Sequence, residues 1–157
     1  MTTRTGTPWL TQEQQVIWRA FLGGITVLMD QLDRDLRTQH DLSLGEYEIL
    51  VRLSEAPDRS IRMAELAAAV AHSRSRVTHT ISRLERDGIV RRDQCSDDGR
   101  GVSAVLTDHG FDVLEKAAHT HVRGVHDYLI ENAPADEFAA LGRIMERVTQ
   151  TLHGKRF

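Results

Sequence analysis

The stretch of residues 73–107 limits the possible folds of this chain more than any other part of the sequence. Its first half has apolar residues at the i, i+4, i+7 spacing of one helix face, namely Val77, Ile81 and Leu84. Ser73 is a favourable N-cap, and Gly88 suits the left-handed position just beyond a helix C-terminus. The pattern predicts an amphipathic helix between these two residues, with its apolar stripe against a core.

A β-hairpin is predicted directly after this helix. Ile89 and Val90 begin a short strand, and residues 102–106 form its partner. The turn between them contains Asp and Gly residues, and Arg100 stands between two glycines at its tip. A thin hairpin with an arginine at its tip fits the minor groove of DNA, and Asp98 can hold the guanidinium by a bidentate pair. The alternative is an ordinary surface hairpin with an exposed ion pair of little energetic weight.

The helix face opposite the apolar stripe is polar and basic. Between His72 and Arg92 there are six arginines and two carboxylates, a net charge of +4, whereas the whole chain has a net charge of −3. A basic stripe on an acidic protein is the electrostatic footprint of nucleic-acid binding, and a solvated arginine-rich face is the alternative. The candidate DNA-contacting residues of the helix and hairpin are Ser73, Arg74, Ser75, Arg76, Thr78, His79, Arg83, Arg86, Asp98 and Arg100.

Several motifs in and around this stretch resemble the signature of the MarR family of winged helix-turn-helix regulators. They are Met63-Ala-Glu-Leu-Ala67, Leu84-Glu85-x-x-Gly88-Ile89-Val90-x-Arg92, Asp98-x-Arg100 and Leu106-Thr107-x-x-Gly110. The similarity extends from about Thr11 to Leu152. Gly99 departs from the family pattern, which often has a second arginine at this place.

The resemblance implies a mainly α-helical fold with a small β-hairpin wing. It implies a winged helix-turn-helix DNA-binding domain over residues 43–107 and a helical dimerisation region over residues 11–40 and 108–155. It further implies a homodimer that regulates transcription at a pseudo-palindromic DNA operator, most often as a repressor released by a small molecule. We expect no enzyme activity, no cofactor and no metal.

Outside the hairpin the sequence predicts only helices. Thr11 with Gln14 and Ser43 with Glu46 have the spacing of capping boxes, and Thr107 is a further N-cap. The predicted helices end near Gln39, Glu55, Ala71, Glu131 and His153, with a break in the chain at Pro57-Asp58.

The first helix and the last two helices have wider apolar faces than a small winged domain can cover. The residues concerned are Phe21, Ile25, Leu28, Leu32, Val122, Val125, Leu129, Phe138, Leu141, Ile144, Val148 and Leu152. A second copy of the chain is the expected partner, because dimeric DNA readers place two recognition helices one DNA turn apart. The alternative is that these residues close the core of a monomer.

An effector site is predicted where the first helix meets the winged domain. The resemblance implies a small aromatic or phenolic acid as the ligand. Arg19 can pair with its carboxylate or phenolate, Trp18 can stack on its ring, and Tyr47 can border the same cavity. The alternative is that Trp18 is a core anchor and Arg19 an intersubunit ion pair.

Other candidate sites are weaker. Cys95 lies near arginines that lower a thiol pKa, so a redox-sensing regulator is an alternative function. His119 and His126 share a helix face, but His121 points elsewhere, which is poor metal geometry. No nucleophile motif or phosphate loop supports an enzyme. An architectural DNA-binding protein without an effector is a further alternative, although such proteins tend to be more uniformly basic.

Length and composition fit one intracellular domain-sized protein. The chain has 157 residues, 40% of them apolar, and no apolar run near 18 residues that could cross a membrane. Its first residues lack the apolar core of a signal peptide, and a single cysteine excludes an internal disulfide. A cytoplasmic location, away from the membrane, is therefore expected.

Overall fold

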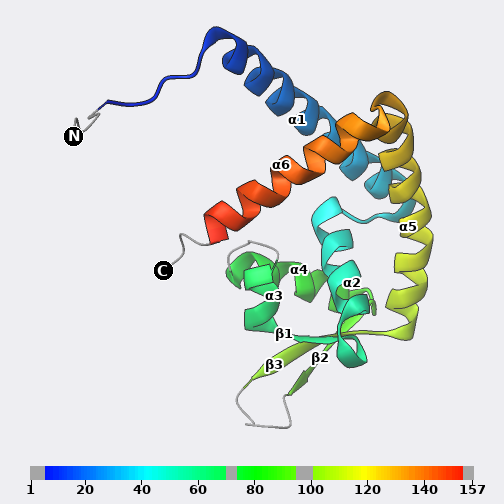
Figure 1. The fold of residues 1–157 in the computed structure, drawn as a ribbon. Coiled ribbons are helices and arrows are strands. Elements are labelled where there is room, and N and C mark those ends of the chain that lie inside the picture. Colours follow the sequence, from blue (N-terminus) through cyan, green and yellow to red (C-terminus); the bar gives the residue numbers. More distant parts are fainter. Residues whose placement is uncertain (1–5, 70–73, 95–100, 154–157) are drawn as a thin grey trace.

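Three helices form an arch over a smaller part that contains the described strands (Figure 1). The computed structural model describes residues 6–69, 74–94 and 101–153. The arch consists of α1 (Gln12–His40), α5 (Asp108–Tyr128) and α6 (Ala135–His153), and a short 3-10 helix, η2 (Ile130–Asn132), joins the last two. A mainly helical chain with one small antiparallel sheet confirms the predicted fold class.

The smaller part contains a helix-turn-helix unit and a three-stranded sheet. Its elements are α2 (Leu44–Glu55), η1 (Pro57–Arg59), β1 (Ser60–Arg62), α3 (Met63–Ala69), α4 (Arg74–Arg86), β2 (Val90–Gln94) and β3 (Val102–Leu106). The strands pair antiparallel in the order β1-β3-β2, so that Ala104 lies between Ile61 and Arg92. The strand β1 was not predicted, because three residues with a single β-branched side chain carry no strand signal of their own. Pairing with β3 makes this segment a strand.

The predicted capping residues begin the helices as expected. The Thr11 hydroxyl accepts from the Gln14 backbone N–H at 3.2 Å, and the Gln14 side chain accepts from the Thr11 N–H at 2.9 Å. Ser43 and Glu46 form the same reciprocal pair at the start of α2. At the end of α1, Asp41 adopts a left-handed conformation with φ 53°, which stops the helix and turns the chain towards α2.

The arch and the sheet join where β3 leads into α5. The Thr107 hydroxyl accepts from the Gly110 N–H at 2.9 Å and donates to the carbonyl oxygen of Gly88 at 2.7 Å. A Cβ on Gly110 would lie 2.0 Å from the carbonyl oxygen of Ile89. Glycine at this position therefore lets α5 approach the chain that links α4 to β2.

The core lies in the smaller part and reaches only the last turns of α1. Its buried side chains come from α2, α3, α4, the sheet, the end of α1 and the start of α5. Leu32 and Leu36 are the buried residues of α1, and Leu32 contacts the region of α5 around Gly124. Leu32 thus packs within the protomer, whereas the sequence analysis assigned it to the face that needs a partner.

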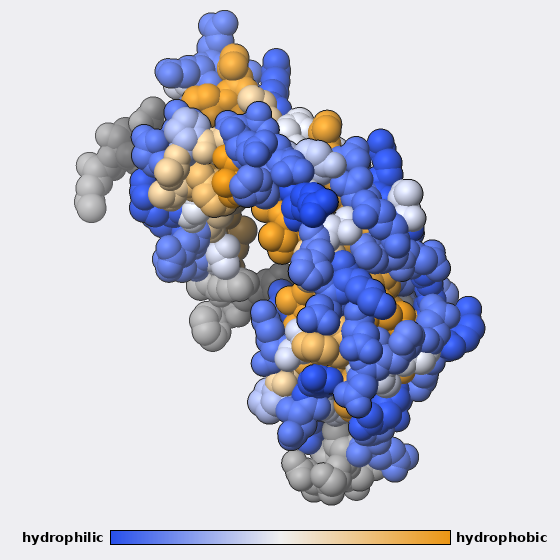
Figure 2. Space-filling view, turned by 90° about the vertical axis from the view of Figure 1, so that its right-hand side faces the viewer, coloured by the Kyte–Doolittle hydropathy of each residue, from blue (hydrophilic) through white to orange (hydrophobic). Residues whose placement is uncertain are grey.

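Six of the other eleven residues of that face are exposed in the protomer, and the rest are half-buried, namely Phe21, Leu28, Val125, Leu129 and Leu141. Apolar surface is visible on the helical part of the molecule in Figure 2. The exposed large apolar residues of the arch include Val16, Ile17, Trp18, Leu22, Ile25, Val27, Met29, Val122, Phe138, Ile144, Met145, Val148 and Leu152. Although these helices have apolar faces, none within the described ranges combines enough length and hydropathy to traverse a bilayer.

Candidate nucleic-acid interface

The helix α4 is fixed by its apolar stripe, as predicted. Val77, Ile81 and Leu84 are each at most 1% exposed and belong to the core. The opposite face is open to solvent and includes Ser75, Arg76, Thr78, His79 and Arg86. This arrangement leaves a row of hydrogen-bond donors, three of them basic, on an accessible helix surface.

The end of α4 has a defined geometry that directs the chain into β2. Gly88 has φ 71°, its N–H donates to the Glu85 carbonyl at 3.0 Å, and the Ile89 N–H donates to the Leu84 carbonyl at 2.9 Å. This pair of bonds is the Schellman motif, which requires a residue that tolerates positive φ. The predicted role of Gly88 is therefore confirmed.

Arg92 on β2 attaches the wing to α4. Its guanidinium donates to the Glu85 carboxylate at 2.5 Å and to the Ser82 hydroxyl at 2.8 Å, and its backbone N–H donates to Glu85 at 3.2 Å. A third guanidinium contact reaches the Thr78 carbonyl at 3.2 Å. In the sequence, Arg92 and Glu85 were recognised only as parts of a motif. Their places on either side of the turn at Gly88 were the signal that could have paired them.

Arg83 turns towards the protein, unlike the exposed residues of α4. Its guanidinium donates to both carboxylate oxygens of Glu46, at 2.9 and 3.1 Å, and to the Asp41 carbonyl at 2.7 Å. Glu46 is 4% exposed and also accepts from the Ser43 backbone N–H at 2.8 Å. Arg83 thus occupies an intramolecular network on the side of α4 that faces α1 and α2.

Part of the predicted interface lies outside the described residues. Ser73, Asp98 and Arg100 belong to that part, and so does Cys95. Arg74 is the first residue of α4. The described part of the predicted interface therefore consists of α4 and of the two wing strands, β2 and β3, without the turn that joins them.

Comparison with known proteins identifies the relatives of this chain. The MarR family pattern matches residues 42–102. The crystal structure of Sco3205, a MarR family transcriptional regulator from Streptomyces coelicolor in complex with DNA, is 39% identical with a TM-score of 0.90, and the match covers 95% of this chain and 93% of that one.

This chain belongs to the MarR family.

Other MarR family proteins agree with this assignment. AbsC from Streptomyces coelicolor is 38% identical with a TM-score of 0.88, over 95% of this chain and all of that one. The regulator PecS from Dickeya dadantii is 29% identical over 128 residues, which cover 78% of this chain and 76% of PecS. MarR family members are DNA-binding transcriptional regulators and not enzymes, so the chain is a transcriptional regulator with a winged helix-turn-helix, as expected.

In this MarR family protein the three predicted effector residues are not brought together within one protomer. Trp18 is half exposed and stacks on Phe21, with ring centroids 5.9 Å apart. Tyr47 is buried against His121 of α5, at 4.6 Å, in the core that also contains Leu36. The helix rise places Trp18 about 27 Å from Leu36 along α1. Any single site made from Trp18, Arg19 and Tyr47 would have to combine two protomers.

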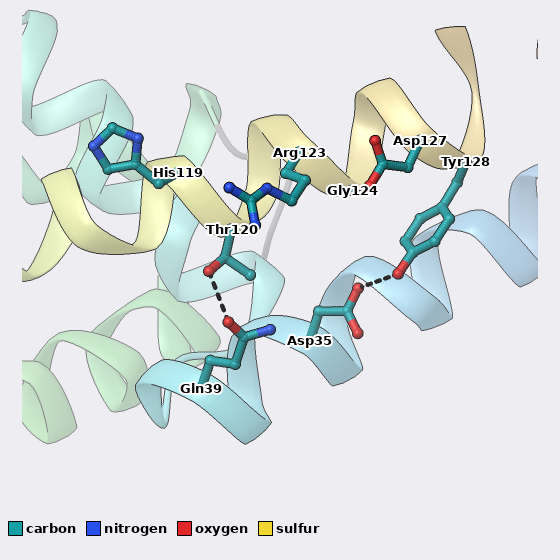
Figure 3. Close-up of a pocket in the computed structure, with 8 residues that line it drawn as sticks. All are labelled: Asp35, Gln39, His119, Thr120, Arg123, Gly124, Asp127 and Tyr128. Carbon is teal, nitrogen blue, oxygen red and sulfur yellow. Dashed lines mark hydrogen bonds between the residues drawn. The ribbon is translucent and has the colours of Figure 1, made fainter. Parts of the chain in front are cut away.

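A polar hollow of about 220 Å³ lies between α1 and α5 (Figure 3). The Tyr128 hydroxyl donates to Asp35 at 2.9 Å and the Thr120 hydroxyl donates to Gln39 at 3.1 Å, so two bridges join the helices along it. The hydrogen bond to Asp35 raises the pKa of Tyr128. Arg123 lies between the bridges on the α5 wall, and Asp35 and Asp127 belong to the same lining, so the hollow combines one guanidinium with two carboxylates (Figure 3).

The histidines of α5 are divided between two environments. The Nδ1 atom of His121 is buried without a hydrogen-bond partner, and burial lowers the pKa of this imidazole. His126 lies on the surface, with its Nδ1 3.2 Å from Asp127 and 3.7 Å from Glu131. These last three side chains are the one group in the described part of the chain that could gather around a cation, and all are exposed.

Proposed function

We propose that this MarR family regulator binds a pseudo-palindromic operator as a homodimer and represses transcription until a small acid releases it. The observation that carries the DNA part is the geometry of α4, whose apolar stripe is buried while its basic face is open. A helix fits the major groove, where arginine and histidine can reach phosphates and base edges. The solved complex of the related Sco3205 with DNA supports DNA binding by this chain.

The proposed DNA contacts come from α4 and from the wing. Ser73, Arg74, Ser75, Arg76, Thr78, His79 and Arg86 would enter or flank the major groove. Arg100, with Asp98 beside it, would enter the minor groove at the tip of the wing. Arg92 supports this proposal indirectly, because its contacts with Glu85 and Ser82 hold the wing and α4 in one relative orientation.

The uncovered apolar side chains of the arch support a homodimer. Val27 is 70% exposed and Ile17 61% exposed on α1, and Leu152 is 58% exposed on α6. Single exposed apolar residues are common on monomers, but so many on two helices are typical of an interaction surface. A two-fold dimer would cover them and place two copies of α4 about 34 Å apart, one turn of DNA.

The effector proposal remains an aromatic or phenolic acid that changes the separation of the two α4 helices. Trp18 and Arg19 support it, as an accessible ring beside a cation. Tyr47 would participate only if the second protomer brings Trp18 near it. A ligand that binds the DNA-free arrangement more tightly shifts the equilibrium by that difference in affinity.

A band-shift experiment tests the proposal. The probe is a duplex selected by the full-length protein from a random-sequence pool, with and without salicylate and related acids. We expect a symmetric selected sequence, a retarded complex, and release by at least one acid in the wild type but not in Arg19→Ala. Failure to select any sequence would reject operator binding. A complex that no acid relieves would leave an effector-independent DNA-binding protein.

A further inference from the structure

Arg83 holds α4 against the corner between α1 and α2. This corner consists of residues 41–46, and Arg83 contacts it through Asp41 and Glu46. We call the set of Arg83, Asp41, Ser43 and Glu46 the Arg83 clamp. Its guanidinium uses both terminal nitrogens, Nη1 on Glu46 of α2 and Nη2 on the carbonyl that ends α1.

Because Glu46 is buried, its carboxylate needs hydrogen-bond partners and an opposite charge within the protein. A carboxylate removed from water is costly unless hydrogen bonds and an opposite charge compensate it. Here Glu46 receives the Ser43 N–H at 2.8 Å, the Ser43 hydroxyl at 3.0 Å and Nη1 of Arg83 at 2.9 Å. A phosphate that attracted Arg83 away would remove the guanidinium that is hydrogen-bonded to this buried carboxylate.

The clamp lies beside a hollow, which makes its polar contacts important for the position of α4. The hollow of about 130 Å³ is lined by Asp33 and Arg37 of α1, by Glu46 and Ile49 of α2, and by Thr80 of α4 among others. Close apolar packing therefore does not fill the space between these helices at this point. Asp33 also accepts from the Leu44 N–H at 2.8 Å, so the corner itself is tied to α1.

We propose that Arg83 is a positioning residue for DNA reading and not a phosphate contact. Through the Arg83 clamp, the orientation of α4 follows the corner at the end of α1, the helix that carries the proposed dimer surface. This inference rests on the proposed docking of α4 in the major groove. It replaces the assignment of Arg83 that residue type and helix face suggested, because Arg83 directs its guanidinium at Glu46 and Asp41.

Arginine-to-lysine and acid-to-amide changes separate the two roles. Arg83→Lys keeps the positive charge, so a phosphate contact would survive it, but lysine cannot reproduce the fork that joins Glu46 to Asp41. Glu46→Gln removes the partner charge without changing the side-chain volume. If Arg83 contacts phosphate, Glu46→Gln releases it for DNA and binding is kept or strengthened. If Arg83 positions α4, both substitutions weaken operator binding.

The experiment measures affinity for a duplex selected by the wild-type protein and for a random-sequence duplex, over a range of salt concentrations. We expect Arg83→Lys and Glu46→Gln each to lower affinity for the selected duplex about tenfold, and the double variant to bind only slightly more weakly, because the residues act as one unit. The salt slope and the affinity for random DNA should stay at the wild-type value in all three. Melting curves ensure that each variant is folded at the temperature of the assay.

Arg86→Ala is the matched control, because Arg86 lies one turn further along α4 and is exposed. It should reduce the magnitude of the salt slope by about one for each phosphate that Arg86 neutralises in the wild type, and it should weaken binding to both duplexes. An unchanged slope in Arg86→Ala would count against the proposed docking of α4, separately from the clamp. The clamp is overturned if Arg83→Ala reduces the slope as Arg86→Ala does, or if Glu46→Gln binds the selected duplex like the wild type.

Discussion

The guanidinium of Arg92 lies 2.5 Å from the carboxylate of Glu85, across the turn that separates α4 from β2. The same guanidinium reaches the Ser82 hydroxyl and the Thr78 carbonyl, so one side chain of the wing contacts three residues of α4. Arg83 contacts the α1–α2 corner from the other side. Two arginine contacts therefore fix α4, the helix proposed to read DNA. Arg92 links it to the wing, and Arg83 links it to the α1–α2 corner.

Arg92→Ala should loosen the wing. It removes a charge-assisted bond to Glu85 and two further contacts, so we expect unfolding free energy to fall by about 1–3 kcal/mol. Hydrogen exchange should accelerate at the β2 and β3 amides before the α5 amides are affected. Arg91→Ala is the control, because exposed Arg91 contacts only its strand neighbour Asp93 among the described residues. Equal exchange in both variants would contradict the role of Arg92.

Gly110→Ala should strongly destabilise the protein. The new Cβ would meet the Ile89 carbonyl oxygen at 2.0 Å, and a backbone atom cannot move aside as a side chain can. We expect the unfolding free energy to fall by about 3 kcal/mol or more in chemical denaturation. Gly142→Ala in α6 is the control, because no atom of the described protomer lies within 4 Å of its Cβ. It should be neutral or slightly stabilising through helix propensity. Similar destabilisation at both positions would contradict the steric explanation.

Protonation of His121 should destabilise the fold at mildly acidic pH. Burial lowers the pKa of this imidazole in the folded state below its ordinary value of 6.5, and the nearby Glu48 opposes that shift. The unfolded chain therefore binds the proton more readily, so this contribution is fully present above pH 6.5 and is lost as pH falls through the folded pKa. His121→Phe keeps a ring against Tyr47. Its melting temperature should depend less on pH below 6.5 than that of the wild type.

Ile144→Asp should prevent self-association without unfolding the protomer. Ile144 is 46% exposed on α6, so a carboxylate there costs little in the monomer but would be buried in the proposed interface. Sedimentation should show a dimer for the wild type and a monomer for the variant, with loss of operator binding. Glu146→Gln, two residues further, is the control. A well-folded wild-type monomer at micromolar concentration would reject the dimer.

Arg100→Ala should weaken DNA binding while dimerisation is unchanged. Arg100 stands between two glycines in the sequence, outside the described residues, and we expect it at the tip of the wing, where a long side chain can enter the minor groove. The expected decrease is about 1–3 kcal/mol in operator binding free energy. The measurement is a titration of the selected duplex, and affinity within about twofold of the wild type would remove Arg100 from the interface.

The sequence predicted what depends on near neighbours in the chain. The stripe of Val77, Ile81 and Leu84 and the turn at Gly88 follow from helix periodicity and backbone sterics, both of which are local. The capping box of Ser43 and Glu46 is local in the same way. These features were sufficient to predict the winged helix and to find the exposed face of α4.

Contacts between distant parts of the chain escaped prediction. Arg83 and Glu46 are 37 positions apart, and nothing in either segment indicates the other as its partner. The effector residues show the converse, because the sequence grouped side chains that a single protomer keeps apart. Trp18 and Tyr47 have suitable chemistry for one pocket, but a straight helix separates Trp18 from the core that contains Tyr47. Residue type alone does not show which of these side chains are neighbours. The path of α1 and α2 through the fold determines which residues come into contact.

Most of α1 extends beyond the core as a long helical arm. Only its last turns are buried, so an arm of about 27 Å extends from Leu36 to Trp18, and a tilt of about 5° about Leu36 would move Trp18 by about 2 Å. Because leverage grows with the length of the arm, a small force applied near Trp18 exerts a large torque on the corner next to α4. A molecule wedged at the far end could thus reorient the reading helix without touching it.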